Sequence, residues 1–94
     1  MFALGDDEWP GASKLNEECG ELIQVIGKLM GSRGDINHWS YNLRDKFHEE
    51  LGDVLAAITF LIDYNDIDED AVCEQSDRKY KQFVEWHLAG DPLD

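Results

Sequence analysis

The fold of this 94-residue chain is decided largely by residues 13–30, SKLNEECGELIQVIGKLM. Apolar residues recur in this stretch at alternating intervals of four and three, which is the spacing of one face of an amphipathic α-helix. The residues on this face are Leu15, Cys19, Leu22, Ile26 and Leu29. Ser13 is a suitable N-cap, and Gly31 and Gly34 interrupt the pattern after it. We therefore predict a first helix from Ser13 to Met30.

The same spacing recurs further along the chain, at Phe47, Leu51, Val54, Ile58 and Leu61. It predicts a second helix that begins within residues 40–43 and ends near Asp63. A third, less regular helix is predicted from Asp68, its N-cap, to Leu88. Since the sequence carries no strand pattern, we predict an all-α fold with three main helices.

The length is sufficient for one small domain. We predict that this domain spans residues 13–89, between a short N-terminal segment (1–12) and a C-terminal tail (90–94). A chain of three helices this short often needs a second subunit to complete its core. We therefore expect the first two helices to form an antiparallel hairpin that completes a four-helix bundle with a partner, in a homodimer or homotetramer.

Both apolar patterns carry pairs of acidic residues three positions apart. Glu18 and Glu21 lie in the first pattern, and Glu50 and Asp53 lie in the second. Residues three apart on a helix point the same way, so four carboxylates converge if the two faces pack. Two charges about 5 Å apart repel by roughly 3 kcal/mol at an effective dielectric constant of 20. Such a cluster needs protonation, separation or a cation, and an all-oxygen set suits Mg²⁺ or Mn²⁺.

The composition excludes some partners. With 21 acidic and 8 basic side chains, the formal net charge is −13, which argues against binding to nucleic acid polymers or to anionic membranes. Cys19 and Cys73 show no zinc-type spacing, and Cys19 fits a small core residue. No apolar leader opens the sequence and no apolar run approaches 18 residues. We expect a soluble, cytoplasmic protein.

The acidic pattern resembles that of a known family. Glu17-Glu18-x-x-Glu21, followed after 28 residues by Glu50-x-x-Asp53, is similar to the motif of MazG-like nucleoside triphosphate pyrophosphohydrolases, in the all-α NTP pyrophosphatase superfamily. The resemblance implies hydrolysis of an NTP or dNTP between the α- and β-phosphates, which gives a nucleoside monophosphate and pyrophosphate. It also implies that Glu18, Glu21, Glu50 and Asp53 ligate Mg²⁺, with Mn²⁺ as a substitute. Glu17 would interact with one of the metal-ligating residues without touching the metal itself, or it would orient or deprotonate the attacking water.

Three further residues are candidates for contacts with the substrate. The resemblance implies that Lys28 and Lys79 face the nucleotide, although each also fits a lysine on an exposed helix surface. Trp39, in the predicted loop 31–40, could stack on a base or cover the edge of the core. Many relatives have a full helix before the first acidic motif, and here only about a dozen residues precede it. The base and sugar preference therefore remain open.

A rival function from another class uses the negative charge alone. A non-catalytic acidic helical protein would bind a basic surface or mimic a nucleic acid. The two functions differ in what one side chain does, because Glu50→Gln should abolish turnover of an enzyme and leave a mimic unaffected.

Overall fold

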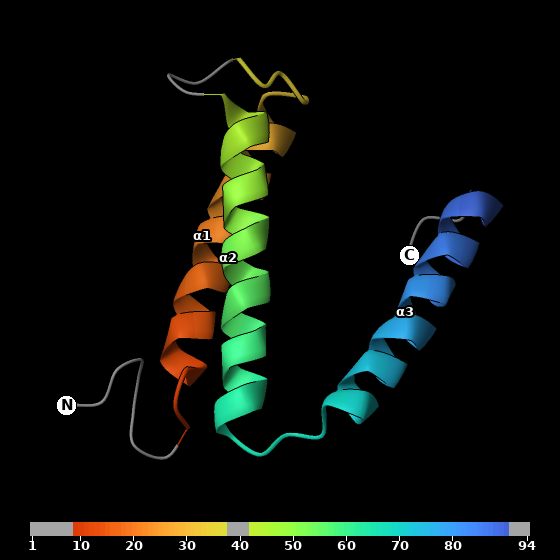
Figure 1. The fold of residues 1–94 in the computed structure, drawn as a ribbon. Coiled ribbons are helices and arrows are strands. Elements are labelled where there is room, and N and C mark those ends of the chain that lie inside the picture. Colours follow the sequence, from red (N-terminus) through yellow and green to blue (C-terminus); the bar gives the residue numbers. More distant parts are fainter. Residues whose placement is uncertain (1–8, 38–41, 91–94) are drawn as a thin grey trace.

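The computed structural model describes residues 9–37 and 42–90. These residues form three α-helices and no β-strand: α1 spans Ala12–Gly31, α2 spans Leu43–Tyr64 and α3 spans Glu69–Ala89 (Figure 1). The predicted all-α class and the three main helices are confirmed. None of the three has both the length and the apolarity that crossing a bilayer requires.

The start of α1 differs from the prediction, because Gly11 and not Ser13 is its N-cap. Gly11 has φ +89°, a left-handed conformation that side chains disfavour. A Cβ atom at Gly11 would also lie 2.7 Å from Cδ1 of Phe60, so glycine allows the start of α1 to approach the end of α2. Asn65 joins the same two ends, since its Nδ2 donates to the Pro10 carbonyl oxygen at 2.7 Å.

The other two helices begin where the sequence predicts. Asn42 caps α2, and its side chain accepts a hydrogen bond from the Asp45 backbone N–H at 3.1 Å. Asp68 is the N-cap of α3, as predicted, and accepts from the Ala71 N–H at 3.2 Å. Such caps satisfy N–H groups that have no partner inside the helix.

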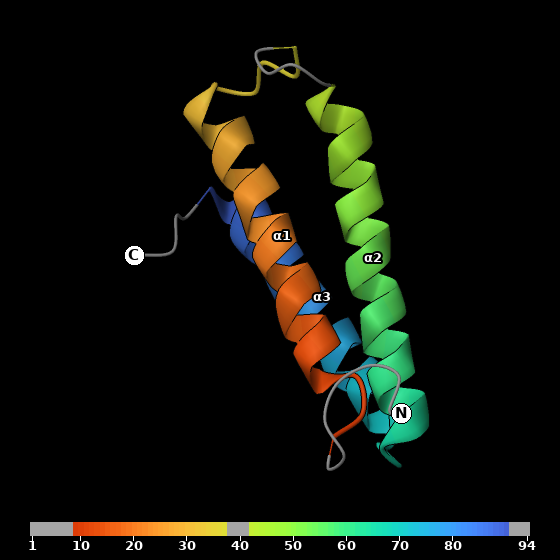
Figure 2. The same cartoon turned by 90° about the vertical axis from the view of Figure 1, so that its left-hand side faces the viewer.

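Helices α1 and α2 run antiparallel and pack side by side along their length, as Figures 1 and 2 show. The buried residues of each helix recur every seven positions. They are Glu18 and Val25 on α1, and Leu43, Glu50 and Ala57 on α2. This heptad spacing is that of a seam between two helices. These most buried positions lie beside the predicted apolar face. Most residues of that face are half-buried, whereas Ile26 and Leu51 are 36% and 40% exposed.

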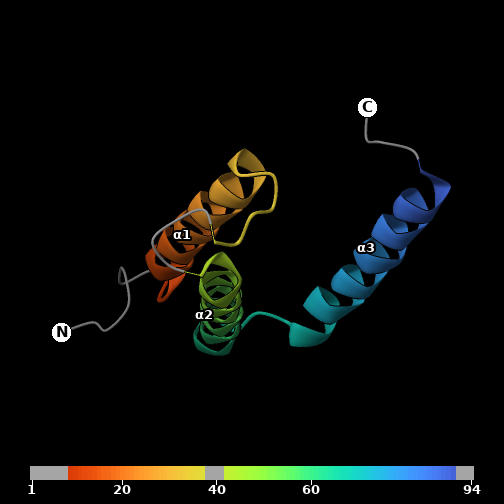
Figure 3. The same ribbon diagram turned by 90° about the horizontal axis from the view of Figure 1, so that it is seen from above.

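Helix α3 stands apart from the hairpin of α1 and α2 (Figures 1 and 3), and none of its residues is buried. One side of it carries apolar residues at helical spacing, namely Tyr80, Phe83, Val84 and Leu88, and all of them are exposed. The Cα radius of gyration is 16.3 Å, against about 12 Å for a compact chain of this length. The predicted four-helix bundle is not formed within one chain and stays a prediction.

Candidate metal centre

Four carboxylates from the two packed helices meet at one place. Glu18 and Glu21 come from α1, and Glu50 and Asp53 come from α2. One carboxylate oxygen from each residue can be chosen so that all four lie within 4.8 Å of one another. The arrangement follows from the hairpin, since each pair is three residues apart and the two pairs face each other across the seam. The structure thus brings together the four residues that the sequence singled out as ligands.

Two of the four carboxylates lie inside the seam. Glu50 is 1% exposed and Glu18 is 8% exposed. In each, the Oε2 atom is buried and has no hydrogen-bond partner among the described residues. A buried carboxylate oxygen without a partner is costly, and native proteins contain few of them. These two oxygens are suited to bind a divalent cation such as Mg²⁺ or Mn²⁺, which prefers oxygen ligands.

The other two carboxylates lie at the solvent side of the cluster. The negative charge of Glu18 raises the pKa of Glu21 above its ordinary value, with smaller contributions from desolvation and from Glu50. Desolvation raises the pKa of Asp53, and the charges of Glu18 and Glu50 add to the effect. Both shifts have the same meaning: without a cation, ionisation of the outer pair is disfavoured.

Two lysines also contact the cluster. Lys14 Nζ lies 3.3 Å from Oε1 of Glu18 and 2.8 Å from Oε1 of Glu17. On α2, Lys46 Nζ lies 3.2 Å from Oε1 of Glu50 and 3.3 Å from Oε2 of Glu49. The same carboxylates raise the pKa of each lysine, first through hydrogen bonds and then through charge. Each buried glutamate thus has one oxygen beside an ammonium group and one that meets no partner in the described part of the chain.

The predicted site did not include Lys14, Lys46 or Glu49. A signal for them is present in the sequence, because residues 14–21 and 46–53 share the pattern Lys-apolar-x-Glu-Glu-x-Gly-acid. The pattern puts a lysine four residues before each buried glutamate, which is the distance of neighbours on a helix face. The repeat spans only eight residues, and the importance of its lysines is clear only from the burial of Glu18 and Glu50.

The remaining predicted residues lie around the cluster or away from it. Glu17 is exposed, pairs with Lys14 and lies outside the group of four. Lys28 is half-buried and lines a hollow together with Glu21 and Glu50. Lys79 lies on α3, with its Nζ near the rings of Phe83 and Trp86, and the single chain does not bring it to the carboxylates. Trp39 lies outside the described residues.

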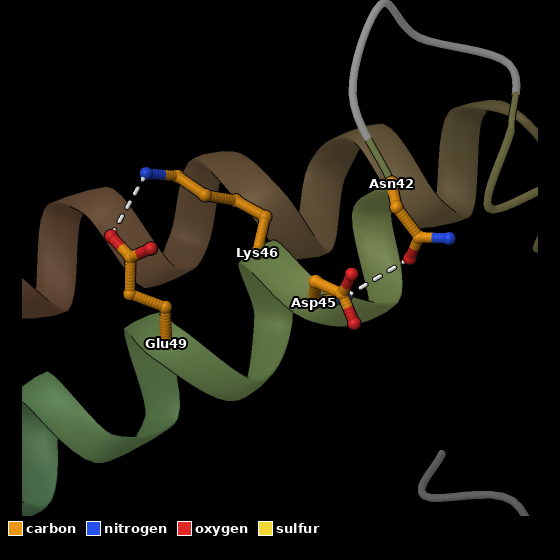
Figure 4. Close-up of a pocket in the computed structure, with 4 residues that line it drawn as sticks. All are labelled: Asn42, Asp45, Lys46 and Glu49. Atoms are coloured by element: carbon orange, nitrogen blue, oxygen red, sulfur yellow. Dashed lines mark hydrogen bonds and ion pairs between the residues drawn. The ribbon is translucent and has the colours of Figure 1, made fainter.

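Hollows flank the carboxylate cluster on both sides along the hairpin. One is lined by Lys14, Glu18, Asp53, Ala56 and Ala57. The other is lined by Glu21, Gln24, Val25, Lys28, Lys46 and Glu50. A further hollow, at the start of α2, is shown in Figure 4, where Lys46 extends to Glu49 and Asn42 reaches Asp45. There is thus space for a ligand beside the cluster on either side.

Searches among curated proteins and among solved structures found no match for this chain. A family model did match: it describes the MazG nucleotide pyrophosphohydrolase domain and covers residues 12–85. The matched range contains α1 and α2 completely, and with them all four clustered carboxylates and both lysines. The chain therefore belongs to the family of MazG nucleotide pyrophosphohydrolase domains.

Proposed function

We propose that this protein hydrolyses a ribo- or deoxyribonucleoside triphosphate between its α- and β-phosphates and releases a nucleoside monophosphate and pyrophosphate. The reaction would depend on Mg²⁺, with Mn²⁺ as a substitute, held by Glu18, Glu21, Glu50 and Asp53. Family membership supports the reaction class. The observation that carries the metal assignment is the pair of buried oxygens, Oε2 of Glu18 and Oε2 of Glu50, which have no partner among the described residues.

The chemistry needs little from the protein besides positioning and charge. Water adds across the anhydride, so that its oxygen bonds to one phosphorus and the bond between that phosphorus and the bridging oxygen breaks. A bound divalent cation would offset the phosphate charge and make water more acidic. We assign to the exposed carboxylate of Glu17 the orientation or deprotonation of the attacking water, since it contacts Lys14, which also contacts Glu18 of the cluster.

The substrate would lie in the hollows beside the carboxylates. Lys28 lines one of them and is our candidate for a contact with a phosphate or with the base. The net charge of −13 opposes binding to a nucleic acid polymer, so we propose free nucleotides as the substrate class. Lys79 lies on α3, so we expect it to contact a nucleotide only in an assembled oligomer.

We further propose that the protein works as a homodimer or homotetramer in which helices of a second copy cover the exposed apolar residues. Tyr80, Phe83 and Leu88 are 69%, 54% and 78% exposed on α3. Ile23 and Leu55, on the hairpin, are exposed to a similar degree. Soluble proteins rarely leave apolar surface of this extent open to water. Light scattering after size exclusion would measure the mass, and a monomer would contradict the assembly.

The decisive experiment for the function measures pyrophosphate release from the eight common ribo- and deoxyribonucleoside triphosphates, with Mg²⁺ or with Mn²⁺. Glu50→Gln keeps the size of the side chain and removes its charge. It should lower turnover by about a hundredfold or more, because even residues that only support a metal ligand typically cost 10- to 100-fold. Glu74→Gln, on α3, is the matched control and should keep full activity.

Two outcomes would contradict this proposal. A folded wild-type protein that releases no pyrophosphate from any of the eight nucleotides with either cation would favour the acidic binding protein over the enzyme. Equal turnover by Glu50→Gln and wild type would show that the reaction does not need Glu50 and would overturn its assignment as a metal ligand. Circular dichroism on the same samples checks that the helices are intact, so that lost activity is not lost folding.

A further inference from the structure

The two lysines at the carboxylate cluster occupy equivalent places. Lys14 lies between exposed Glu17 and buried Glu18 on α1, and Lys46 lies between exposed Glu49 and buried Glu50 on α2. In both copies the ammonium group lies within 3.3 Å of Oε1 of the buried glutamate. In both copies the Oε2 atom of that glutamate is left without a partner among the described residues.

Ordinary surface ion pairs contribute little, and these lysine side chains are themselves 41% and 38% exposed. The difference lies in their partners. The side chains of Glu18 and Glu50 are only 10% and 2% exposed, so water solvates these two carboxylates poorly. A nearby ammonium group is then a main source of compensating charge.

The charges involved match those of a divalent cation. Four ionised carboxylates carry four negative charges, and the two ammonium groups supply two positive charges, as one Mg²⁺ or Mn²⁺ would. The lysines and the cation would also act on the same two buried glutamates, through Oε1 and through Oε2. Each ammonium group lies within 3.3 Å of a glutamate that would hold the cation, so it would repel the cation. Each lysine therefore stabilises the metal-free cluster and opposes cation binding.

We propose that Lys14 and Lys46 are built-in counterions of the metal centre, which stabilise the carboxylate cluster while no cation is bound and weaken its affinity for a divalent cation. This role rests on the proposed metal centre, since without a cation there is nothing for the lysines to oppose. It is distinct from a contact with substrate, because it is exerted in the absence of nucleotide.

The test measures the binding of Mn²⁺ alone, by electron paramagnetic resonance of the free ion, with no nucleotide present. Lys14→Met and Lys46→Met remove the charge and keep an unbranched side chain. Each should tighten Mn²⁺ binding by about three- to tenfold, which is what one screened charge close to a divalent ion contributes. In EDTA the same variants should unfold at a lower temperature than wild type, and excess Mn²⁺ should remove that difference.

Lys81→Met on α3 is the matched control, since it changes the net charge equally but lies outside both hollows of the cluster. Lys46→Arg keeps the charge and should bind Mn²⁺ as wild type does, which also separates the charge from any packing effect of methionine. A variant that does not fold in EDTA can be purified with Mn²⁺ and measured by competition with a chelator.

The outcomes separate two failures. If wild type does not bind Mn²⁺, the metal centre itself is wrong. If wild type binds Mn²⁺ but both methionine variants bind it no more tightly than Lys81→Met, or less tightly, the lysines are not opposing counterions and the metal centre stands. Unchanged unfolding temperatures in EDTA would likewise overturn the stabilising role.

Discussion

The hairpin of α1 and α2 and the third helix are built from helices of similar length but differ in how far they are packed. The helices α1, α2 and α3 have 20, 22 and 21 residues. Helix α3 has an aspartate N-cap, two acidic residues in its first turn and a glycine directly after its last residue. All buried positions of the helices nevertheless lie in the hairpin, and α3 has none. Capping and helix propensity therefore account for α3 as a helix, whereas the carboxylate cluster requires two helices packed on each other.

This difference also explains why the cluster can exist at all. A carboxylate at a buried heptad position weakens a helix seam, and here the seam has Glu18 on one side and Glu50 on the other. Val25, Leu43 and Ala57 occupy the neighbouring heptad positions and hold the two helices together around them. The apolar side of α3, in contrast, is not covered by any other part of residues 9–37 and 42–90.

The largest effect that would test this contrast comes from Phe83→Asp. Phe83 is 54% exposed in the single chain, so on the chain alone the substitution should leave helix content unchanged. If a second copy covers it, a charge replaces a buried aromatic ring, and the dissociation constant of the oligomer should rise by about a hundredfold or more. Analytical ultracentrifugation over a range of protein concentrations measures it.

Gln82→Asp is the matched control for Phe83→Asp. It adds the same charge one residue away, roughly 100° round the helix, outside the apolar side of α3. Assembly should be unchanged in this variant. Equal assembly of wild type, Gln82→Asp and Phe83→Asp would show that the apolar side of α3 has no part in the interface. The proposal that a second copy covers this side of α3 would then be wrong.

The helices and the two acidic pairs, Glu18 with Glu21 and Glu50 with Asp53, were predictable from the sequence, because both depend on short-range spacing. The exact seam was not. Spacing alone favoured Leu15, Cys19 and Leu22, which are half-buried, whereas the most buried position of this part of α1 is Glu18. An apolar pattern shows which side of a helix avoids water, but it does not show which residues of that side are buried most deeply against the neighbouring helix.

The start of α1 was not predictable for a related reason. Ser13 has the better capping chemistry, but Gly11 is selected by a contact with Phe60, nearly fifty residues later in the sequence. Lys14 and Lys46 were missed because a lysine next to glutamates on a helix normally indicates a solvated surface. Only the burial of Glu18 and Glu50 gives those pairs a different meaning.

A smaller effect, on the hairpin alone, is expected from Gly11→Ala. The added Cβ would lie 2.7 Å from Phe60 Cδ1, and φ of +89° is strained for alanine. The free energy of unfolding should fall by about 1–3 kcal/mol. Denaturation in urea, followed by circular dichroism, measures the loss in the presence of EDTA.

Gly27→Ala is the control, because Gly27 lies inside α1 and a Cβ there meets nothing within 4 Å. Alanine should stabilise that position by up to about 1 kcal/mol through its higher helix propensity. If Gly11→Ala were as stable as wild type, the close junction between the start of α1 and the end of α2 would not contribute to holding the hairpin together.

The smallest effect is a pH dependence that should arise in the hairpin and not in α3. Glu21 and Asp53 have pKa values above their ordinary values of 4.5 and 3.8. Between the ordinary and the raised pKa values, these two groups therefore bind more protons in the folded protein than in the unfolded chain. The contribution of these two groups to the stability of the metal-free protein therefore falls as the pH rises from their ordinary values through the raised ones. A saturating divalent cation should cancel this loss, because it stabilises the ionised forms.

The unfolding temperature in EDTA, measured from about pH 4 to about pH 7, should decline less steeply for Glu21→Gln than for wild type. Glu69→Gln, in the first turn of α3, should leave the decline unchanged. An equal decline in all three proteins would mean that the repulsion between the clustered carboxylates is relieved by some means other than protonation of Glu21.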